Sequence, residues 1–196
     1  VIELDDLSKL IDMPFNSDST VPDTELDDLS LLLDETLPRL RLTQAQAADP
    51  HAAFGLGDVP LWLEVGFGGG EHTLDQIAAH PEVGYIASEV FENGLCALLT
   101  RLVPEGAEAT GALPRNLRLW PQDARHLLRA LPDAALDRLF LMFPDPWPKA
   151  RHAKRRFVHP ELLPMVARTL KPGAIWRIAS DDPTYQAWVH ECMGAQ

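Results

Sequence analysis

The stretch LWLEVGFGGGEH, from Leu61 to His72, decides the fold. It begins with apolar residues typical of a buried strand, passes through a turn that contains Gly66, Gly68 and Gly70, and continues with helical periodicity. Glycines in such a turn let the backbone bend sharply and approach a ligand that a Cβ atom would exclude. The stretch therefore predicts a strand, a ligand-binding turn and a helix, in that order.

The same alternation of short apolar runs and helical periodicity continues along the chain, which indicates βαβ units and a parallel sheet. We expect strands at Leu61–Val65, Gly84–Glu89, Asn116–Trp120, Leu136–Phe143 and Ala174–Ser180. We expect helices at Glu71–His80, Glu92–Val103, Ala124–Leu131, Pro160–Leu170 and Pro183–Met193. Such a sheet binds ligands beyond the carboxyl ends of its strands, so functional side chains are expected directly after each strand.

The chain has 196 residues, enough to bury one sizeable core, and its net charge is -12. Most of that charge comes from Glu3–Glu35, where Lys9 is the single cation. We interpret residues 1–24 as an acidic, flexible arm and residues 25–196 as one domain. The domain is expected to begin with an amphipathic helix that Asp23 or Thr24 caps, with these leucines on one face: Leu26, Leu29, Leu32 and Leu33.

Other features of the composition predict the compartment and exclude several classes of protein. No apolar run is long enough for a membrane span, and the acidic N-terminus lacks the features of a secretory signal, so we expect a cytoplasmic protein. Cys96 and Cys192 lack metal-ligand spacing and are expected to be reduced. We expect no metal and no membrane partner, and the sequence leaves monomer and homodimer open.

The turn after the first strand reads E-x-G-x-G-x-G, starting at Glu64 and including Gly66 and Gly68. A dinucleotide fingerprint needs a last glycine where this chain has Glu71, a carboxylate that would face the pyrophosphate. This argues against a nicotinamide-dependent dehydrogenase. The pattern suits a positively charged ligand without phosphate, such as S-adenosylmethionine, and a merely tight turn is the alternative.

Two more carboxylates follow the next strands. Glu89 ends the second strand, where an acid can accept hydrogen bonds from the hydroxyls of a ribose; a solvated strand-end carboxylate is the alternative. Asp123 follows the third strand, where it can cap the helix that starts at Ala124 or accept a hydrogen bond from an adenine amine. The two interpretations of Asp123 are compatible with each other.

The fourth strand leads into LMFPDPWPKARHAKRR, Leu141 to Arg156. Prolines on both sides of Trp147 predict a stiff turn that holds Asp145 beside the indole. A fixed carboxylate beside an aromatic plane suits a flat base with N–H groups, and the cations that follow suit the phosphates around it. These cations are Lys149, Arg151, Lys154, Arg155 and Arg156. An ordinary basic surface loop is the alternative.

Five strings carry a resemblance to a known family: EVGFGGGEH, SEV, QDA, FPDPWPKARHAKRR and LKPGAIWRIASDDPTY. Together they resemble the bacterial form of the tRNA (guanine-N7-)-methyltransferase family, from about Leu31 to Met193. This resemblance implies a Rossmann-like fold that transfers the methyl group of S-adenosylmethionine to guanine N7 in the tRNA variable loop. It implies that these residues line the donor site: Glu64, Glu89, Asp123 and Asp145. It also implies that Lys149 and Asp181 contact the tRNA.

The resemblance also sets what Asp145 is expected to do. Guanine N7 has an in-plane lone pair and no proton, so no general base is needed, and Asp145 is interpreted as an orienting acceptor. The family continues beyond Pro183–Met193 with further strands, so we expect a five-stranded remnant in the order 3-2-1-4-5 with one uncovered sheet edge. A methyltransferase for another base nitrogen and a catalytically silent RNA-binding protein remain alternatives.

Overall fold

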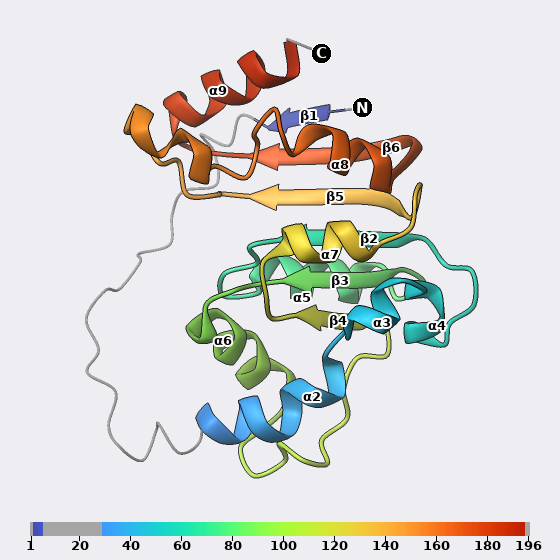
Figure 1. Ribbon diagram of the computed structural model, residues 1–196. Helices are drawn as coiled ribbons and strands as arrows, with labels where there is room; N and C mark the ends of the chain where they lie inside the picture. Colours follow the sequence, from blue (N-terminus) through green and yellow to red (C-terminus); the bar gives the residue numbers. More distant parts are fainter. Residues whose placement is uncertain (1, 6–28, 195–196) are drawn as a thin grey trace.

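A parallel sheet forms the centre of the computed structural model, which describes residues 2–5 and 29–194 (Figure 1). Its six strands are β1 Ile2–Asp5, β2 Leu61–Val65, β3 Gly84–Ser88, β4 Leu117–Trp120, β5 Leu136–Met142 and β6 Leu170–Ala179. They lie in the order β1-β6-β5-β2-β3-β4, and each neighbouring pair is parallel. The predicted α/β class and the predicted order of the five later strands are confirmed.

Helices cover both faces of this sheet (Figure 1). The longer helices are α5 Glu71–Ala79, α6 Glu92–Leu102, α7 Ala124–Ala130, α8 Leu163–Thr169 and α9 Pro183–Gly194. Because side chains alternate along a strand, Leu63 of β2 packs with the core under α7, α8 and α9, whereas Trp62 packs with the core under α5 and α6. The carboxyl ends of the strands are thereby held at one edge between two packed layers.

Two of the predicted strand and helix boundaries from Leu61 onward differ by three or more residues, for identifiable reasons, and the others agree to within one residue. Helix α8 begins at Leu163 instead of Pro160, and Pro164 then falls in its first turn, where a missing N–H costs no hydrogen bond. Strand β6 begins at Leu170 instead of Ala174, because Leu170 pairs with Leu136 before the register shifts. Gly173, with φ of 83°, lies in the irregular part of the strand.

Short helical segments precede β2. They are the π-helix η1 Leu32–Thr36, α2 Leu37–Leu40, α3 Gln44–Ala47 and α4 Pro50–Phe54. One of them, α2, lies beside β4 (Figure 1). Leu32 is buried and the side chains of Leu29 and Leu33 pack around the same core as α6, as the predicted amphipathic face requires. The predicted caps Asp23 and Thr24 and the predicted contact of Leu26 lie outside the described residues.

Strand β1 is a feature that the sequence did not predict. Its backbone pairs with β6, with Ile2 opposite Trp176 and Asp5 opposite Ala179. The sheet edge beside β6, which we expected to be uncovered, therefore carries a strand made from residues expected to be part of a flexible arm. The rest of that arm, residues 6–24, lies outside the described residues. Strand pairing between distant parts of a chain leaves no local pattern, which explains why it was missed.

Within residues 2–5 and 29–194, no helix combines the length and the apolar character that a membrane crossing requires. Cys96 and Cys192 are both free and buried, and burial raises the pKa of each thiol. Both thiols therefore stay protonated and weakly reactive. In the same part of the chain, no group of His, Cys, Asp and Glu side chains is arranged to hold a metal ion.

Candidate functional site

The glycine turn, which we define as Gly66–Gly70, follows β2 at the carboxyl edge of the sheet. Gly66, Gly68 and Gly70 have φ of 73°, 57° and 82°, in the left-handed region that favours glycine. A Cβ on Gly66 or Gly68 would project into open space, whereas one on Gly70 would lie 2.6 Å from Leu98 Cδ1. The first two glycines therefore leave room for a ligand, and the third allows α5 to pack closely on α6.

Glu64 lies in β2 directly before the glycine turn and is buried, with 1% of its surface exposed. Its Oε2 accepts hydrogen bonds from Thr73 Oγ1 at 2.6 Å and from the Tyr85 hydroxyl at 2.8 Å, and His72 Nδ1 lies 3.1 Å from its Oε1. Burial and the Glu64 carboxylate raise the pKa of the Tyr85 phenol, which therefore remains a donor. Glu64 thus fastens the first turn of α5 to β2 and β3.

A cavity of about 220 Å³ opens beside the glycine turn, where β2 and β3 end and α7 begins. Gly66, Glu89 and Asp123 line it, and each of them was predicted to contact a donor ligand. Val90 and Phe157 contribute apolar surface to the same lining. We call it the glycine-turn cavity, and it combines carboxylates with apolar walls as a nucleoside-like ligand requires.

Glu89 is fixed in the wall of this cavity by backbone donors. Its Oε2 accepts from the Gly68 N–H at 2.9 Å, and its Oε1 accepts from Val90 N–H at 2.7 Å and Phe91 N–H at 3.0 Å. Only 6% of the residue is exposed. A carboxylate can accept about four hydrogen bonds, so Glu89 retains capacity for a ligand hydroxyl. The side chain therefore couples the glycine turn to the end of β3 and faces the cavity.

Asp123 caps the amino end of α7, which confirms one of the two roles that the sequence suggested for it. Its Oδ1 accepts from the Arg125 N–H at 2.8 Å, and its Oδ2 lies 3.1 Å from Arg125 Nη1. The side chain is 42% exposed and lines the glycine-turn cavity. A contact with a ligand amine is therefore compatible with the cap.

The basic loop, which we define as Phe143–Arg156, follows β5 and contains the 3-10 helix η2 Ala150–Arg155. Phe143 and Trp147 have φ of 50° and 42°, left-handed values that are rare for bulky residues. Such backbone persists only where the surrounding structure holds it in place. The Phe143 N–H donates to the Ala179 carbonyl at 2.8 Å, which anchors the start of the loop to β6.

Arg156 holds the turn around Trp147 from inside the protein. It is 5% exposed, its Nε donates to the Pro146 carbonyl at 2.9 Å, and its Nη2 donates to the Trp147 carbonyl at 3.1 Å. Its guanidinium also lies 4.8 Å from the ring centroid of Trp188 on α9. Arg156 was predicted to contact phosphates, and its burial gives it a structural role in the loop instead.

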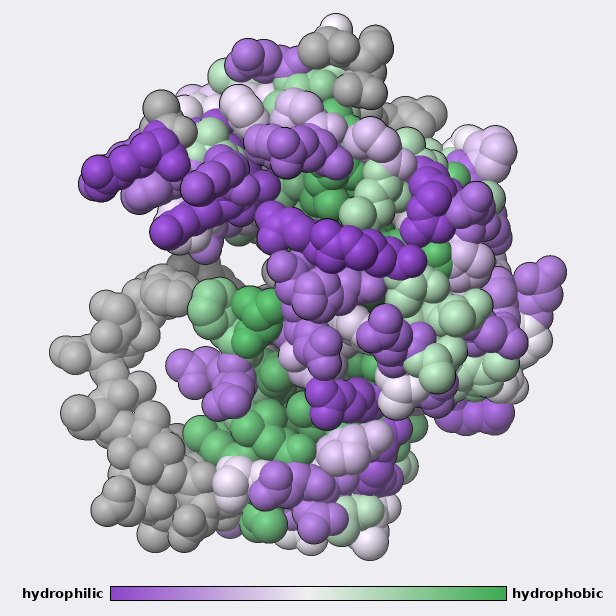
Figure 2. Space-filling model, viewed as in Figure 1, coloured by the Kyte–Doolittle hydropathy of each residue, from purple (hydrophilic) through white to green (hydrophobic). Residues whose placement is uncertain are grey.

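The other charged residues of the basic loop are exposed, and Figure 2 shows long hydrophilic side chains on this face of the molecule. The side chains of Asp145, Lys149 and Lys154 form no hydrogen bond or ion pair within residues 29–194. Arg155 lies 4.8 Å from the ring centroid of Trp147, so the indole plane that we expected to meet a base contacts a guanidinium here. Arg151 Nε approaches His152 Nε2 at 3.3 Å. Most of this charge is therefore available to a ligand.

Comparisons with known proteins identify the family. Residues 58–196 match the family described as "Putative methyltransferase". A tRNA (guanine-N(7)-)-methyltransferase from Granulibacter bethesdensis is 67% identical over 166 residues, which cover 84% of this chain and 70% of that protein. Proteins of the same name from Rhodospirillum rubrum and Paramagnetospirillum magneticum are 49% and 46% identical, and the matched parts cover 57% and 68% of their lengths.

The chain belongs to the tRNA (guanine-N7-)-methyltransferase family. The predicted family is thereby confirmed, and with it the enzyme class and S-adenosylmethionine as the methyl donor that this class uses. The chain spans 57% to 70% of the length of these three relatives.

In this member of the tRNA (guanine-N7-)-methyltransferase family, the predicted donor residues separate into three positions. Glu89, Asp123 and Gly66 meet at one cavity, whereas Glu64 lies buried beneath the glycine turn. Asp145 is exposed on the basic loop and does not line the cavity. Asp181, predicted to contact tRNA, is exposed two residues after β6, beside Asp182, whose Oδ1 accepts from the Tyr185 N–H of α9. The roles of these residues remain predictions.

The sequence did not predict several residues that support the site. Thr73 and Tyr85 support Glu64, but each looked like an ordinary helix or strand residue. Trp188 packs on Arg156, and its Nε1 donates to the Val158 carbonyl at 2.6 Å, which ties α9 to the end of the basic loop. The four-residue spacing of Arg125 and Arg129 on a predicted helix was the one available signal for a cationic face on α7.

Proposed function

We propose that this chain transfers the methyl group of S-adenosylmethionine to N7 of a guanine in the tRNA variable loop. The observation that carries the proposal is that the glycine-turn cavity and the basic loop lie at the same edge of the sheet, with Arg155 in the lining of the cavity. Family membership gives the reaction class. A cytoplasmic location is part of the proposal, because the substrate is a tRNA.

The residues around the glycine-turn cavity fit S-adenosylmethionine, which supplies an electrophilic methyl group on a positively charged sulfur when bound. Gly66 and Gly68 leave the space beside the turn free of side chains. Glu89 would accept a hydrogen bond from a ribose hydroxyl, and Asp123 would accept one from the adenine amine. Arg125 and Arg155 line the same cavity, so hydrogen bonds to these carboxylates, and not a net negative charge, would select the ligand. Glu64 would not contact the ligand; its hydrogen bond with Thr73 would hold the start of α5 in place beside the glycine turn.

Asp145 would orient the acceptor base. Guanine N7 attacks with its in-plane lone pair and loses no proton, so the chain needs no general base. An exposed carboxylate without a partner in residues 29–194 is free to accept N–H groups from the guanine edge. It would also stabilise the positive charge that develops on the purine during transfer. Positioning of the base would supply most of the rate enhancement.

The exposed cations of the basic loop would hold the tRNA backbone. Lys149, Arg151, Lys154 and Arg155 project from η2 or its cap, and phosphate contacts position a nucleic acid without reading its sequence. Asp181 would contact the substrate from the neighbouring strand end. We leave Arg156 out of this set because it is buried behind the loop.

A catalytically silent RNA-binding protein is the second candidate. The position of Asp145 favours it, since this residue does not line the glycine-turn cavity. One experiment separates the candidates: incubation of unmodified tRNA with labelled S-adenosylmethionine, followed by nucleoside analysis, with donor binding measured on the same preparation. Formation of 7-methylguanosine supports the proposal, and a different methylated nucleoside assigns the transfer to another base nitrogen. Donor binding with no methyl transfer supports the silent protein.

A further inference from the structure

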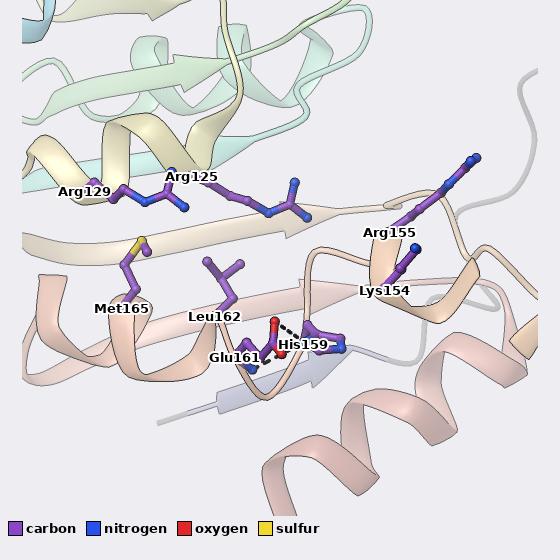
Figure 3. Close-up of a pocket in the computed structure, with 8 residues that line it drawn as sticks. All are labelled: Arg125, Arg129, Lys154, Arg155, His159, Glu161, Leu162 and Met165. Atoms are coloured by element: carbon purple, nitrogen blue, oxygen red, sulfur yellow. Dashed lines mark hydrogen bonds and ion pairs between the residues drawn. The ribbon is translucent and has the colours of Figure 1, made fainter. Parts of the chain in front are cut away.

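A second cavity, of about 500 Å³, lies between α7, η2 and the segment that leads into α8 (Figure 3). Cationic side chains surround it: Arg125, Arg129, Lys154 and Arg155. Its apolar surface comes from Leu162 and Met165. We call this cavity the basic groove. Among the described residues that line it, Glu161 is the only carboxylate, and its side chain is 92% exposed.

The cations of the basic groove are only partly neutralised. Arg125 pairs with Asp123 at 3.1 Å, and Glu161 lies 4.0 Å from His159, which also lines the groove. The side chains of Arg129 and Lys154 have no ion pair or hydrogen bond within residues 29–194. Arg129 follows Arg125 by four residues, so both side chains leave the same face of α7, as Figure 3 shows. Like charges about one helical turn apart repel each other, and an anionic ligand bound between them would reduce that repulsion.

The basic groove adjoins the glycine-turn cavity. Arg125 and Arg155 line both cavities. A ligand bound in the groove would therefore lie next to Glu89 and Asp123, the carboxylates that would hold the methyl donor. The groove also extends the exposed charge of the basic loop onto α7, a helix that the sequence interpretation did not connect with RNA. A continuous cationic track over two elements suits a polyanion better than a single small ion.

We propose that the basic groove binds the sugar-phosphate backbone of the tRNA, next to the guanine that meets the methyl donor at the mouth of the glycine-turn cavity. The identity of the RNA rests on the proposed function. Phosphates would contact Arg129 and Lys154 at the rim, and a ribose would pack on Leu162 and Met165. Because the chain carries a net charge of -12, a local cationic track is what allows it to approach a nucleic acid.

The test compares tRNA binding by two variants of the whole chain. Arg129→Gln removes one exposed cation of the groove. Arg115→Gln removes an exposed arginine just before β4, at the amino ends of the strands, whereas the glycine turn follows their carboxyl ends. Neither side chain has a partner in the described residues, so both variants should keep the stability of the parent chain, which thermal unfolding checks. The dissociation constant for unmodified tRNA is measured at about 50 and about 200 mM salt.

For Arg129→Gln we expect the dissociation constant at low salt to rise about threefold to tenfold and the salt slope to fall by about one. Arg115→Gln should stay within about twofold of the parent. Equal effects of the two variants would overturn the proposal. So would weaker binding of inorganic phosphate by Arg129→Gln with unchanged binding of tRNA, because the groove would then hold a small anion only.

A parallel methyl-transfer assay separates this inference from the proposed function. If the parent chain binds tRNA through Arg129 but transfers no methyl group, the result supports RNA binding by the groove and contradicts the proposed activity. If methyl transfer occurs and Arg129→Gln binds tRNA and reacts like the parent chain, the result supports the proposed activity and contradicts RNA binding by the groove. The affinity for S-adenosylmethionine should be the same in both variants, because neither residue lines the glycine-turn cavity.

Discussion

The glycine turn and the basic loop lie at the same edge of the sheet but hold their charged side chains in opposite ways. Glu64 and Glu89 are almost fully buried, and all of their carboxylate oxygens have partners inside the chain. Asp145 and Lys149 are exposed, and their side chains have no partner within residues 29–194. Fixed, satisfied groups suit a small ligand with a defined shape, whereas exposed cations suit a large polyanion.

Each region nevertheless depends on one buried charge. Glu64 holds the start of α5 beneath the glycine turn, and Arg156 holds the carbonyls of Pro146 and Trp147 beneath the basic loop. Arg156 contacts Trp147, which has left-handed backbone, and Glu64 lies two residues before Gly66, which has it too. We infer that a buried charge at the base of each region fixes the backbone, while ligand contacts come from the groups above it.

The largest expected effect comes from the exposed acid of the basic loop. Asp145→Asn should lower the rate of methyl transfer about a hundredfold or more, because the amide cannot stabilise the positive charge that develops on guanine. Stability and donor affinity should not change, since Asp145 is exposed and has no partner in the described residues. Single-turnover transfer to tRNA measures the rate. Asp75→Asn, an exposed site on α5, is the matched control, and an equal rate in the two variants would remove Asp145 from the mechanism.

Loss of the buried cation should disturb the whole basic loop. Arg156→Gln leaves the carbonyls of Pro146 and Trp147 without their guanidinium donor, so we expect the free energy of unfolding to fall by about 2 kcal/mol. Trypsin should also cleave faster between Lys149 and Arg155. Arg156→Lys keeps the charge but not the planar pair of donors, so it should recover only part of both losses. Parent-like stability and cleavage in Arg156→Gln would show that other contacts hold the loop.

A smaller and more selective effect is expected at the glycine-turn cavity. Glu89→Gln replaces one acceptor oxygen with a donor, so we expect the dissociation constant for S-adenosylmethionine to rise about tenfold, or about 1.4 kcal/mol. The affinity for tRNA should stay constant, because the cations of the basic loop are untouched. Isothermal titration with each ligand measures both values, and Glu105→Gln, at an exposed site after α6, is the control. Weaker tRNA binding with unchanged donor binding would reverse the assignment of the two regions.

The smallest effect concerns the buried tyrosine below the basic loop. Burial raises the pKa of Tyr185 from 10.0 to about 12, against a smaller opposing effect of its hydrogen bond with Val158. The folded protein therefore keeps a proton that the unfolded chain loses above pH 10, so stability is full below that pH and falls as the pH rises toward 12. Between pH 9 and pH 11 we expect Tyr185 to account for about 1 kcal/mol of lost stability.

Denaturant unfolding at these two pH values, with Tyr185→Phe as the comparison, tests this expectation. The variant should lose less stability between the two conditions than the parent chain. An identical loss in both chains would mean that Tyr185 titrates in the folded protein as it does in the unfolded chain.

Local patterns predicted the elements around the glycine turn well, because strand, turn and helix follow each other within a few residues. The observed β2 has the predicted bounds Leu61–Val65, and α5 begins at Glu71 as expected. Interactions between distant residues were not predictable in this way. The pairing of β1 with β6 and the burial of Arg156 both depend on contacts that no neighbouring residue reveals.

The candidate site shows the same division. Glycine spacing and strand-end carboxylates identified Gly66, Glu89 and Asp123, which the fold brings to one cavity. The run of cations after Trp147 gave no sign that one member points inward, because charge alone carries no information on burial. The basic groove combines α7 with η2, and its existence follows only from their packing.

The most direct test of the central claim uses the acceptor atom itself. Methyl transfer is measured on a tRNA transcript made with guanosine and on the same transcript made with 7-deazaguanosine, which carries carbon in place of N7, and binding of each transcript is measured in parallel. Our account predicts that both transcripts bind and that only the guanosine transcript accepts a methyl group. Methylation of the 7-deazaguanosine transcript would contradict the assignment of guanine N7 as the acceptor.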